Sequence, residues 1–217
     1  MTKNKETILV FSAHNDDQII GAGGTLAKYA KEGKEVIVCI FSFGESSHPH
    51  FHKEEIIKTR VKELHEADDI LSINKSFLLG LKEGDFFNDF TKKKRKEVIV
   101  RAIKERDPIK VFTHSNDDPH PDHKAVNNII LSILKDLNYK GEILTFDVWN
   151  PFNLRNRNLP KLIIDITETL PLKMKALKCH ESQFLALVTM IPSIYSRAIV
   201  HGLKYGYRYA EKFTKIQ

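Results

Sequence analysis

Apolar runs of strand length alternate with longer amphipathic segments along most of the chain. The run KEVIVCIFSF, residues 34–43, is nearly continuous in its apolar residues, as strands buried in parallel sheets are. Similar runs predict strands at residues 6–13, 76–81, 109–115, 141–149 and 161–167. Amphipathic periodicity predicts helices at residues 23–33, 54–71, 91–106, 122–138 and 171–183, with one or two more between 190 and 213, broken at Gly202 and Gly206.

This alternation predicts an α/β, Rossmann-like fold, with a mostly parallel sheet and helices on both faces. No repeat, low-complexity tract or linker interrupts the pattern, so residues 1–217 are expected to form a single domain. Ligands of such sheets bind beyond the carboxyl ends of the strands. Functional side chains are therefore expected in the loops that follow the predicted strands.

The composition of the chain bears on its cellular location and on the kind of molecule that it binds. Cys39 and Cys179 lie far apart, so no disulfide framework is expected and a cytoplasmic location is predicted. No apolar stretch approaches the roughly 18 residues of a membrane span, so no integral membrane segment is expected. Much of the net charge of +6 lies in residues 91–106, which lack the interleaved aromatics of single-strand nucleic-acid binders. Nucleic acid is therefore not an expected partner, and the charge favours an anionic small molecule.

Two clusters of histidine and aspartate each follow a predicted strand. The first, in AHNDDQ, contains His14, Asp16 and Asp17. The second lies in VFTHSNDDPHPDHKAV, residues 111–126, where His114, Asp117 and Asp118 precede His120, Asp122 and His123. If the two strands are neighbours, the clusters meet at one edge of the sheet. A catalytic zinc takes three protein ligands from histidine and carboxylate groups, and His14, Asp17 and His123 would provide them.

A metal in this place implies a hydrolytic reaction. A divalent metal lowers the pKa of a bound water toward neutrality and polarises a carbonyl group. Asp16, next to the predicted ligand Asp17, is the expected general base. His120 is expected to stabilise an oxyanion or to protonate a leaving amine.

Two other interpretations of these loops are available. Asp16 or Asp17 could cap one helix and Asp122 the next, but capping explains one acid per loop and none of the histidines. The glycines of GAGG, residues 21–24, could suggest dinucleotide binding. They do not follow the G-x-G-x-x-G pattern, and close backbone packing is the preferred interpretation.

The motifs resemble those of the PIG-L/LmbE-like N-deacetylases. AHNDDQ is similar to the first motif of that family, A-H-P-D-D-E, and HPDH to its second motif. TRVKELHEADD, LGLKEGDF and KMKALKCHESQF resemble three weaker features, in the order of the family. The resemblance implies a single zinc, or another divalent metal, held by His14, Asp17 and His123. It also implies Asp16 as base and His120 as the second catalytic group.

Other residues are candidates for substrate binding or for support of the ligands. Asn15 and Gln18 replace the proline and glutamate of the first motif, and Gln18 is expected to accept a hydrogen bond, for instance from a ligand histidine. Arg60 and Glu63 form either a surface pair or part of the site. The remaining candidates are Asp118, Asp122, His180 and Gln183. His48, His50 and His52 are interpreted as exposed loop residues that could border the substrate cleft.

The sequence therefore predicts a zinc-dependent hydrolase that removes an N-acetyl group from an N-acetylglucosamine-type sugar or its conjugate. The alternative is a non-catalytic protein of the same fold that binds a sugar or nucleotide. The tyrosine-rich tail, together with the family, suggests a homo-oligomer.

Overall fold

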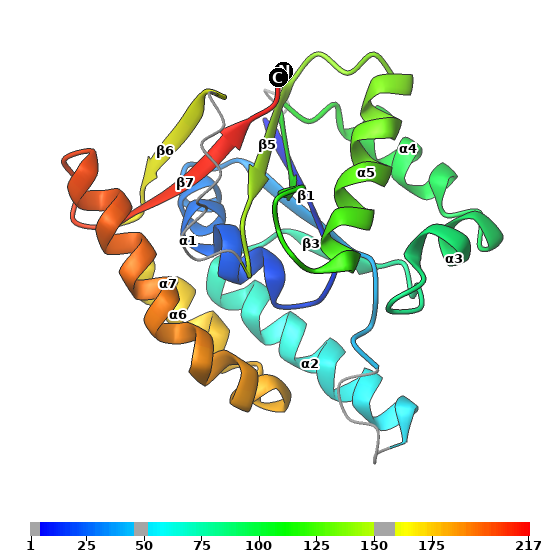
Figure 1. Ribbon diagram of the computed structural model, residues 1–217, viewed down its shortest axis with the longest axis horizontal. Coiled ribbons are helices and arrows are strands. Elements are labelled where there is room, and N and C mark those ends of the chain that lie inside the picture. The colour runs from blue at the N-terminus through cyan, green and yellow to red at the C-terminus, as the bar shows by residue number, and fades with distance from the viewer. Residues whose placement is uncertain (1–4, 46–51, 150–158) are drawn as a thin grey trace.

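Seven strands form one sheet in the computed structural model, which describes residues 5–45, 52–149 and 159–217 (Figure 1). The strand order is β3-β2-β1-β4-β5-β7-β6. The first five are parallel, and β7 runs antiparallel to both β5 and β6. The strands are β1 (Thr7–Ser12), β2 (Glu35–Ile40), β3 (Lys75–Leu78), β4 (Lys110–His114), β5 (Glu142–Phe146), β6 (Lys161–Asp165) and β7 (Ala210–Lys215).

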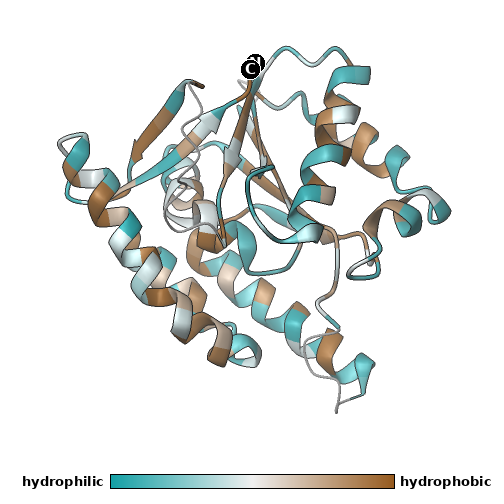
Figure 2. Cartoon of the chain, in the orientation of Figure 1, coloured by the Kyte–Doolittle hydropathy of each residue, from teal (hydrophilic) through white to brown (hydrophobic). Residues whose placement is uncertain are grey.

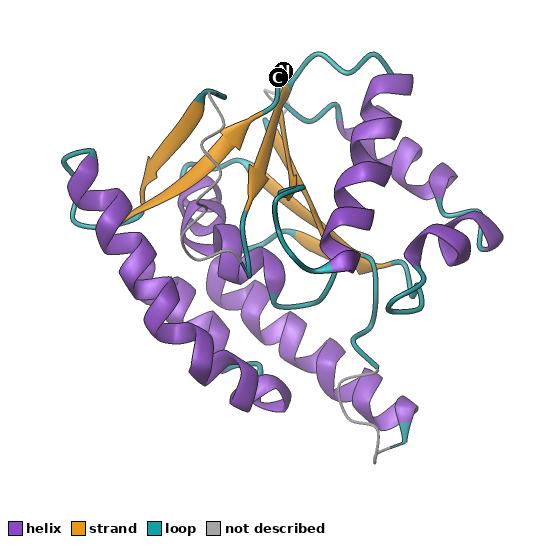
Figure 3. Ribbon diagram, viewed as in Figure 1, coloured by secondary structure: helices purple, strands orange, loops and turns teal. Residues whose placement is uncertain are grey.

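Helices cover both faces of this sheet (Figure 3). On one face, side chains of α1 (Asp17–Lys31), α2 (Lys53–Leu71), α6 (Leu170–Lys178) and α7 (Phe184–Lys204) join one apolar core. On the other face, α3 (Phe86–Lys92), α4 (Lys96–Arg106) and α5 (Pro121–Asp136) join a second core. A short 3-10 turn, η1 (Glu181–Gln183), precedes α7. The predicted Rossmann-like α/β fold is confirmed.

Some predicted boundaries were wrong. The first helix begins at Asp17, not residue 23, so the GAGG glycines lie within α1. A Cβ atom at Gly24 would lie 2.9 Å from Ile166, and one at Gly21 would lie 2.2 Å from Phe146, so close packing requires both glycines. The predicted helix 91–106 is two helices, separated by a turn in which Lys94 has a φ of 50°.

The C-terminal segment differs most from expectation. α7 continues through Gly202, where a Cβ atom would lie 2.7 Å from the carbonyl oxygen of Arg208. The chain turns at Gly206, whose φ is +81°, and then forms β7 between β5 and β6. One described helix also departs from the expectation that no stretch could span a membrane. Residues Glu181–Lys204 are long and apolar enough by length and composition alone, although part of α7 packs in the core.

A buried ion pair fixes the middle of α1 to the rest of the domain. Glu211 on β7 accepts hydrogen bonds from the backbone amides of Gly24 and Thr25, at 3.1 and 2.8 Å. Lys173 on α6 lies 2.6 Å from the same carboxylate and donates to the carbonyl oxygen of Ile20. Both side chains are buried. Three elements distant in sequence are thus joined at one point on α1.

A second buried acid, Asp68 on α2, is expected to make stability depend on pH. Burial raises its pKa to about 7. The hydroxyl of Ser76 acts against this shift, and the negative charge of Asp69 adds to it. An unfolded aspartate loses its proton at about pH 4, so the folded state binds more protons between these values and loses stability as the pH rises. The unmodified chain should therefore lose up to about 4 kcal/mol of its free energy of unfolding between pH 4 and pH 8 through this group, and Asp68→Asn should not show this loss. Urea unfolding at both pH values measures this, and a constant difference would contradict the assignment.

Candidate active site and metal centre

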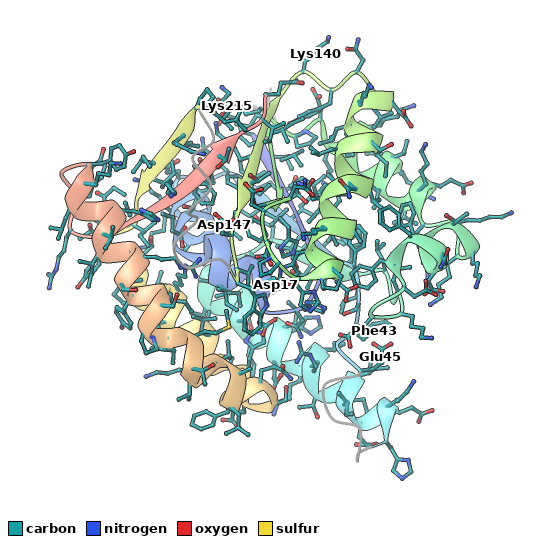
Figure 4. All side chains as sticks on the ribbon, in the orientation of Figure 1. Asp17, Phe43, Glu45, Lys140, Asp147 and Lys215 are labelled. Atoms are coloured by element: carbon teal, nitrogen blue, oxygen red, sulfur yellow. The ribbon has the colours of Figure 1, made fainter. Side chains whose placement is uncertain are left out.

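The two histidine and aspartate clusters meet at the carboxyl end of the sheet. β1 and β4 are hydrogen-bonded neighbours, so the loops after Ser12 and His114 lie side by side. Asp17, labelled in Figure 4, stands at the start of α1 beside these strand ends. The predicted meeting of the clusters therefore follows from the order of the strands.

Two histidine side chains and one backbone amide converge on a single carboxylate oxygen of Asp17. Asp17 Oδ2 lies 3.1 Å from His14 Nδ1 and 3.2 Å from His123 Nε2, and it accepts the backbone amide of His14 at 2.8 Å. Ligand atoms of all three residues lie within 4.8 Å of one another, which suits a metal ion. A second group of this kind consists of His14, His120 and Asp122.

The electrostatics of the cluster favour a cation. Burial lowers the pKa of His14 and of His123, but Asp17 and the neighbouring carboxylates outweigh it and raise these pKa values to about 10 and about 9. Burial raises the pKa of Asp17, but the two imidazoles hold it well below its usual value. The buried carboxylate thus draws positive charge to this point, and a divalent cation would compete with protons for the same atoms.

Asp118 and Asp122 contact the ring nitrogens of His123 and His14 that face away from Asp17. Asp118 Oδ1 lies 2.9 Å from His123 Nδ1, while its Oδ2 accepts the backbone amides of Val148 and Trp149. Burial raises the pKa of Asp118, but its interaction with His123 and the backbone amides of Trp149 and His120 lower it to about 2. Asp122 accepts the amide of Gly84 and lies 3.4 Å from His14 Nε2. Carboxylates in this position fix the ring orientation of ligand histidines.

The capping interpretation accounts for neither loop. Asp16 is the N-cap residue of α1, yet its side chain makes no cap hydrogen bond. His120, not Asp122, caps α5, because its Nδ1 accepts the backbone amide of Asp122. Burial and the nearby His123 and His14 lower the pKa of His120. A neutral His120 ring whose Nδ1 is an acceptor carries its proton on Nε2 and can donate from there.

Gln18 supports the loop backbone. Its Oε1 accepts from Ser12 Oγ at 3.0 Å, and its Nε2 donates to the carbonyl oxygen of Asn15 at 2.9 Å. Asn15 is also fully buried, and its side chain donates to the carbonyl oxygen of Arg60 and lies 2.9 Å from His180 Nε2. The two departures from the usual motif thus join one network, which connects the loop to α2 and to the residue before η1.

A cavity opens beside the cluster. Its lining includes His14, Asp16, Arg60, Glu83, His120 and Gln183. Arg60 is 2% exposed, and within the described part of the chain its Nε and Nη1 have no hydrogen-bond partner. Glu63 is also buried and accepts from both the amide and the hydroxyl of Ser182. The Arg60 and Glu63 side chains are therefore not a surface pair.

Glu83 was missed from the sequence, and His114 was noted in the second cluster without a role. Glu83 reaches the cavity from the turn after β3 and accepts from Ser42 Oγ. His114 lies beneath the cluster, where its ring stacks on His123 with centroids 4.0 Å apart and its Nε2 accepts the amide of Ala13. The neighbouring HPDH motif was a signal for His114, while Glu83 stood in the quoted LKEGDF segment. His48 and His50 lie outside the described residues, and His52 is the N-cap residue of α2.

Known proteins resemble the chain in sequence and in fold. It is 27% identical to a diacetylchitobiose deacetylase of Thermococcus kodakarensis, over 94% of this chain and 80% of the relative. The structure of N,N'-diacetylchitobiose deacetylase from Pyrococcus horikoshii, bound to an inhibitor, matches with a TM-score of 0.81 at 25% identity, covering 99% of this chain and 85% of that one.

The fold is shared with an enzyme of a different reaction. A 4-carboxy-2-hydroxymuconate hydratase of Pseudomonas putida matches with a TM-score of 0.83 at 21% identity, over 98% of this chain and 96% of that one. The family model for GlcNAc-PI de-N-acetylase matches residues 9–134, which include both histidine and aspartate clusters. The chain is therefore a member of the PIG-L family, as its motifs predicted.

Proposed function

We propose that the chain is a zinc-dependent deacetylase that removes an N-acetyl group from an N-acetylglucosamine-type sugar or its conjugate. The observation that carries the proposal is the convergence of His14, Asp17 and His123 beside Asp16, whose carboxylate is not used to cap a helix. Deacetylases among the relatives support this reaction class.

His14, Asp17 and His123 would hold the metal. The fit rests on the short distances between their ligand atoms and on the buried negative charge of Asp17. Asp118 and Asp122 would keep the two imidazoles in place for the metal. When bound there, a divalent metal lowers the pKa of a water and polarises the amide carbonyl. Zinc suits the two nitrogen donors and one carboxylate, and another divalent metal is the alternative.

The other side chains of the site have distinct roles in the reaction. Asp16 takes a proton from the attacking water as it adds to the amide carbonyl. His120 Nε2–H donates a hydrogen bond to the oxygen that gains negative charge. The proton held by Asp16 then passes to the nitrogen as the C–N bond breaks, which releases acetate and a free amine. Arg60, two of whose donor nitrogens have no hydrogen-bond partner among the described residues, and Gln183 line the cavity and would bind the substrate.

Metal content and acetate release test the proposal together. The purified chain is expected to contain about one zinc per molecule, since His14, Asp17 and His123 are the one ligand set proposed and the second group shares His14 with it. It should release acetate from at least one member of a panel of N-acetylglucosamine mono- and disaccharides, nucleotide sugars and glycosides. A chelator should stop the release and added zinc should restore it.

The other outcomes separate the alternatives. A chain without zinc or acetate release that still binds the sugars would favour the non-catalytic binding protein. Zinc with hydration of an unsaturated tricarboxylate, and no acetate release, would favour the reaction type of the hydratase relative. A cytoplasmic location and assembly into a homo-oligomer remain predictions.

A further inference from the structure

The outer side of α7 carries a stripe of exposed apolar side chains. Leu185, Val188, Tyr195, Ile199 and Leu203, the α7 stripe, recur at intervals of three, four or seven residues and so share one helix face. Leu185 is 82% exposed and Leu203 is 72% exposed. The opposite face packs in the core through Leu187, Met190, Ile194 and Ala198. Apolar residues recur along the whole of α7 in Figure 2, and the helix lies at the edge of the molecule in Figure 1.

The stripe contains no charge. No residue from Phe184 to Ser196 is ionisable except Tyr195, and Arg197 points its guanidinium toward the carbonyl oxygen of Asp147. A solvent-facing helix surface usually carries charged residues. A contiguous apolar surface of this kind on a folded domain marks an interaction site.

Cations gather at the C-terminal end of the stripe. They are Lys204 on α7, Lys161 on β6 and Lys212 on β7, while the guanidinium of Arg197 lies behind them and donates to the carbonyl oxygen of Asp147. Burial lowers the pKa of Lys212, and repulsion from the other three cations lowers it further, against attraction from Asp147. Burial likewise lowers the pKa of His201 to about 4, with repulsion from three of these cations. This end of the helix therefore has a local excess of positive charge.

Aromatic side chains flank the same end. Tyr205 and Tyr207 are 42% and 41% exposed, and Lys204 Nζ lies over the ring of Tyr205. Tyrosine and lysine together are typical of the boundary between an apolar phase and water. An amphipathic helix with an apolar face and basic residues binds anionic membranes in this way.

A second copy of the chain would match these features less well. It would bury the apolar stripe, but between residues 181 and 204 it would offer one acidic residue, Glu181, to several cations. An anionic bilayer offers apolar acyl chains to the stripe and phosphate groups to the cations at the same time. We infer that the α7 stripe docks on the surface of an anionic membrane, with Lys204 and its neighbours against the headgroups.

Docking there would bring the active site close to the membrane. Ala186 and Met190, on the first turns of α7, line the cavity, while Leu185 and Val188 on the same turns face outward. The inference concerns a surface outside the proposed catalytic residues. It therefore does not depend on which reaction the site performs.

Vesicle co-sedimentation of the full chain tests the inference. The chain should sediment with phosphatidylcholine vesicles that contain phosphatidylglycerol and not with phosphatidylcholine alone, and high salt should release it. The double variant Leu185→Ser/Leu203→Ser and the single variant Lys204→Glu should each lower the partition coefficient by about tenfold or more. Phe87→Ser, which removes a half-exposed apolar side chain from α3 on the other face of the sheet, should leave it unchanged.

Three results would overturn the inference. They are no sedimentation with anionic vesicles, sedimentation that the stripe variants do not change, and an equal loss in Phe87→Ser. Sedimentation velocity of the same proteins tests whether a second copy of the chain covers the stripe instead. A dimer that Leu185→Ser/Leu203→Ser converts to monomer, without vesicle binding, would mean that a second copy covers the stripe. Circular dichroism of each variant checks that the fold is retained.

Discussion

Replacing Asp16 with asparagine should lower acetate release by about 10³-fold while zinc remains bound. Asparagine has nearly the same shape as aspartate but cannot take a proton from water. Asp16 makes no cap hydrogen bond, so its loss should leave the start of α1 intact. The measurement compares the kcat of acetate release and the zinc content of Asp16→Asn with those of the unmodified chain.

His123→Ala is the matched control for this prediction. It removes a proposed ligand from the same cluster, so it should lose zinc and activity together. Loss of zinc in Asp16→Asn as well would make Asp16 a ligand, and full activity would place the base elsewhere. If the unmodified chain releases no acetate, the proposed reaction fails before either variant is compared.

Replacing Glu211 with methionine should reduce the free energy of unfolding by about 3–5 kcal/mol. The substitution leaves Lys173 with a buried charge and no carboxylate beside it, and two backbone amides of α1 lose their acceptors. Denaturant unfolding followed by circular dichroism measures the loss. An exposed salt bridge would contribute less than about 1 kcal/mol, so the result also tests whether the pair is buried.

Replacing the other partner of the pair, in Lys173→Met, is expected to reduce the free energy of unfolding by less. Glu211 would keep the amides of Gly24 and Thr25 as donors, whereas Lys173 would keep only the carbonyl oxygen of Ile20 in the first variant. Unpaired buried groups cost most when their remaining partners are fewest. Equal losses in the two variants would show that the amide bonds contribute little.

Much of the site could be predicted because its chemistry lies in two short segments. His14, Asp16 and Asp17 follow one strand, His120 and His123 follow another, and neighbouring parallel strands bring such loops together. The supporting contacts were harder to predict. The amide partners of Asp118, at Val148 and Trp149, come from the segment after β5, which only the folded sheet brings close.

The fold could be predicted where strands and helices have a strong period. β7 was missed because AEKFTK is short and half polar, and its pairing with β5 and β6 depends on the sheet and not on its own residues. The contacts of Asn15 and Gln18 were also hard to predict: Gln18 accepts a hydrogen bond as expected, but the donor is Ser12 and not a ligand histidine. Their other partners are backbone oxygens and a histidine from other loops, which no periodicity in the sequence reveals.

The position of β7 has a consequence for biosynthesis. β7 follows every other described element along the chain, yet it lies between β5 and β6 and supplies Glu211 to α1. A nascent chain that has emerged only as far as α7 has no partner strand for β6 and no carboxylate for Lys173. We therefore expect the sheet to be completed, and Gly24 and Thr25 of α1 to be held by Glu211, only after residues 210–215 leave the ribosome. Folding of this edge of the sheet would then have to wait for the last of its seven strands in chain order.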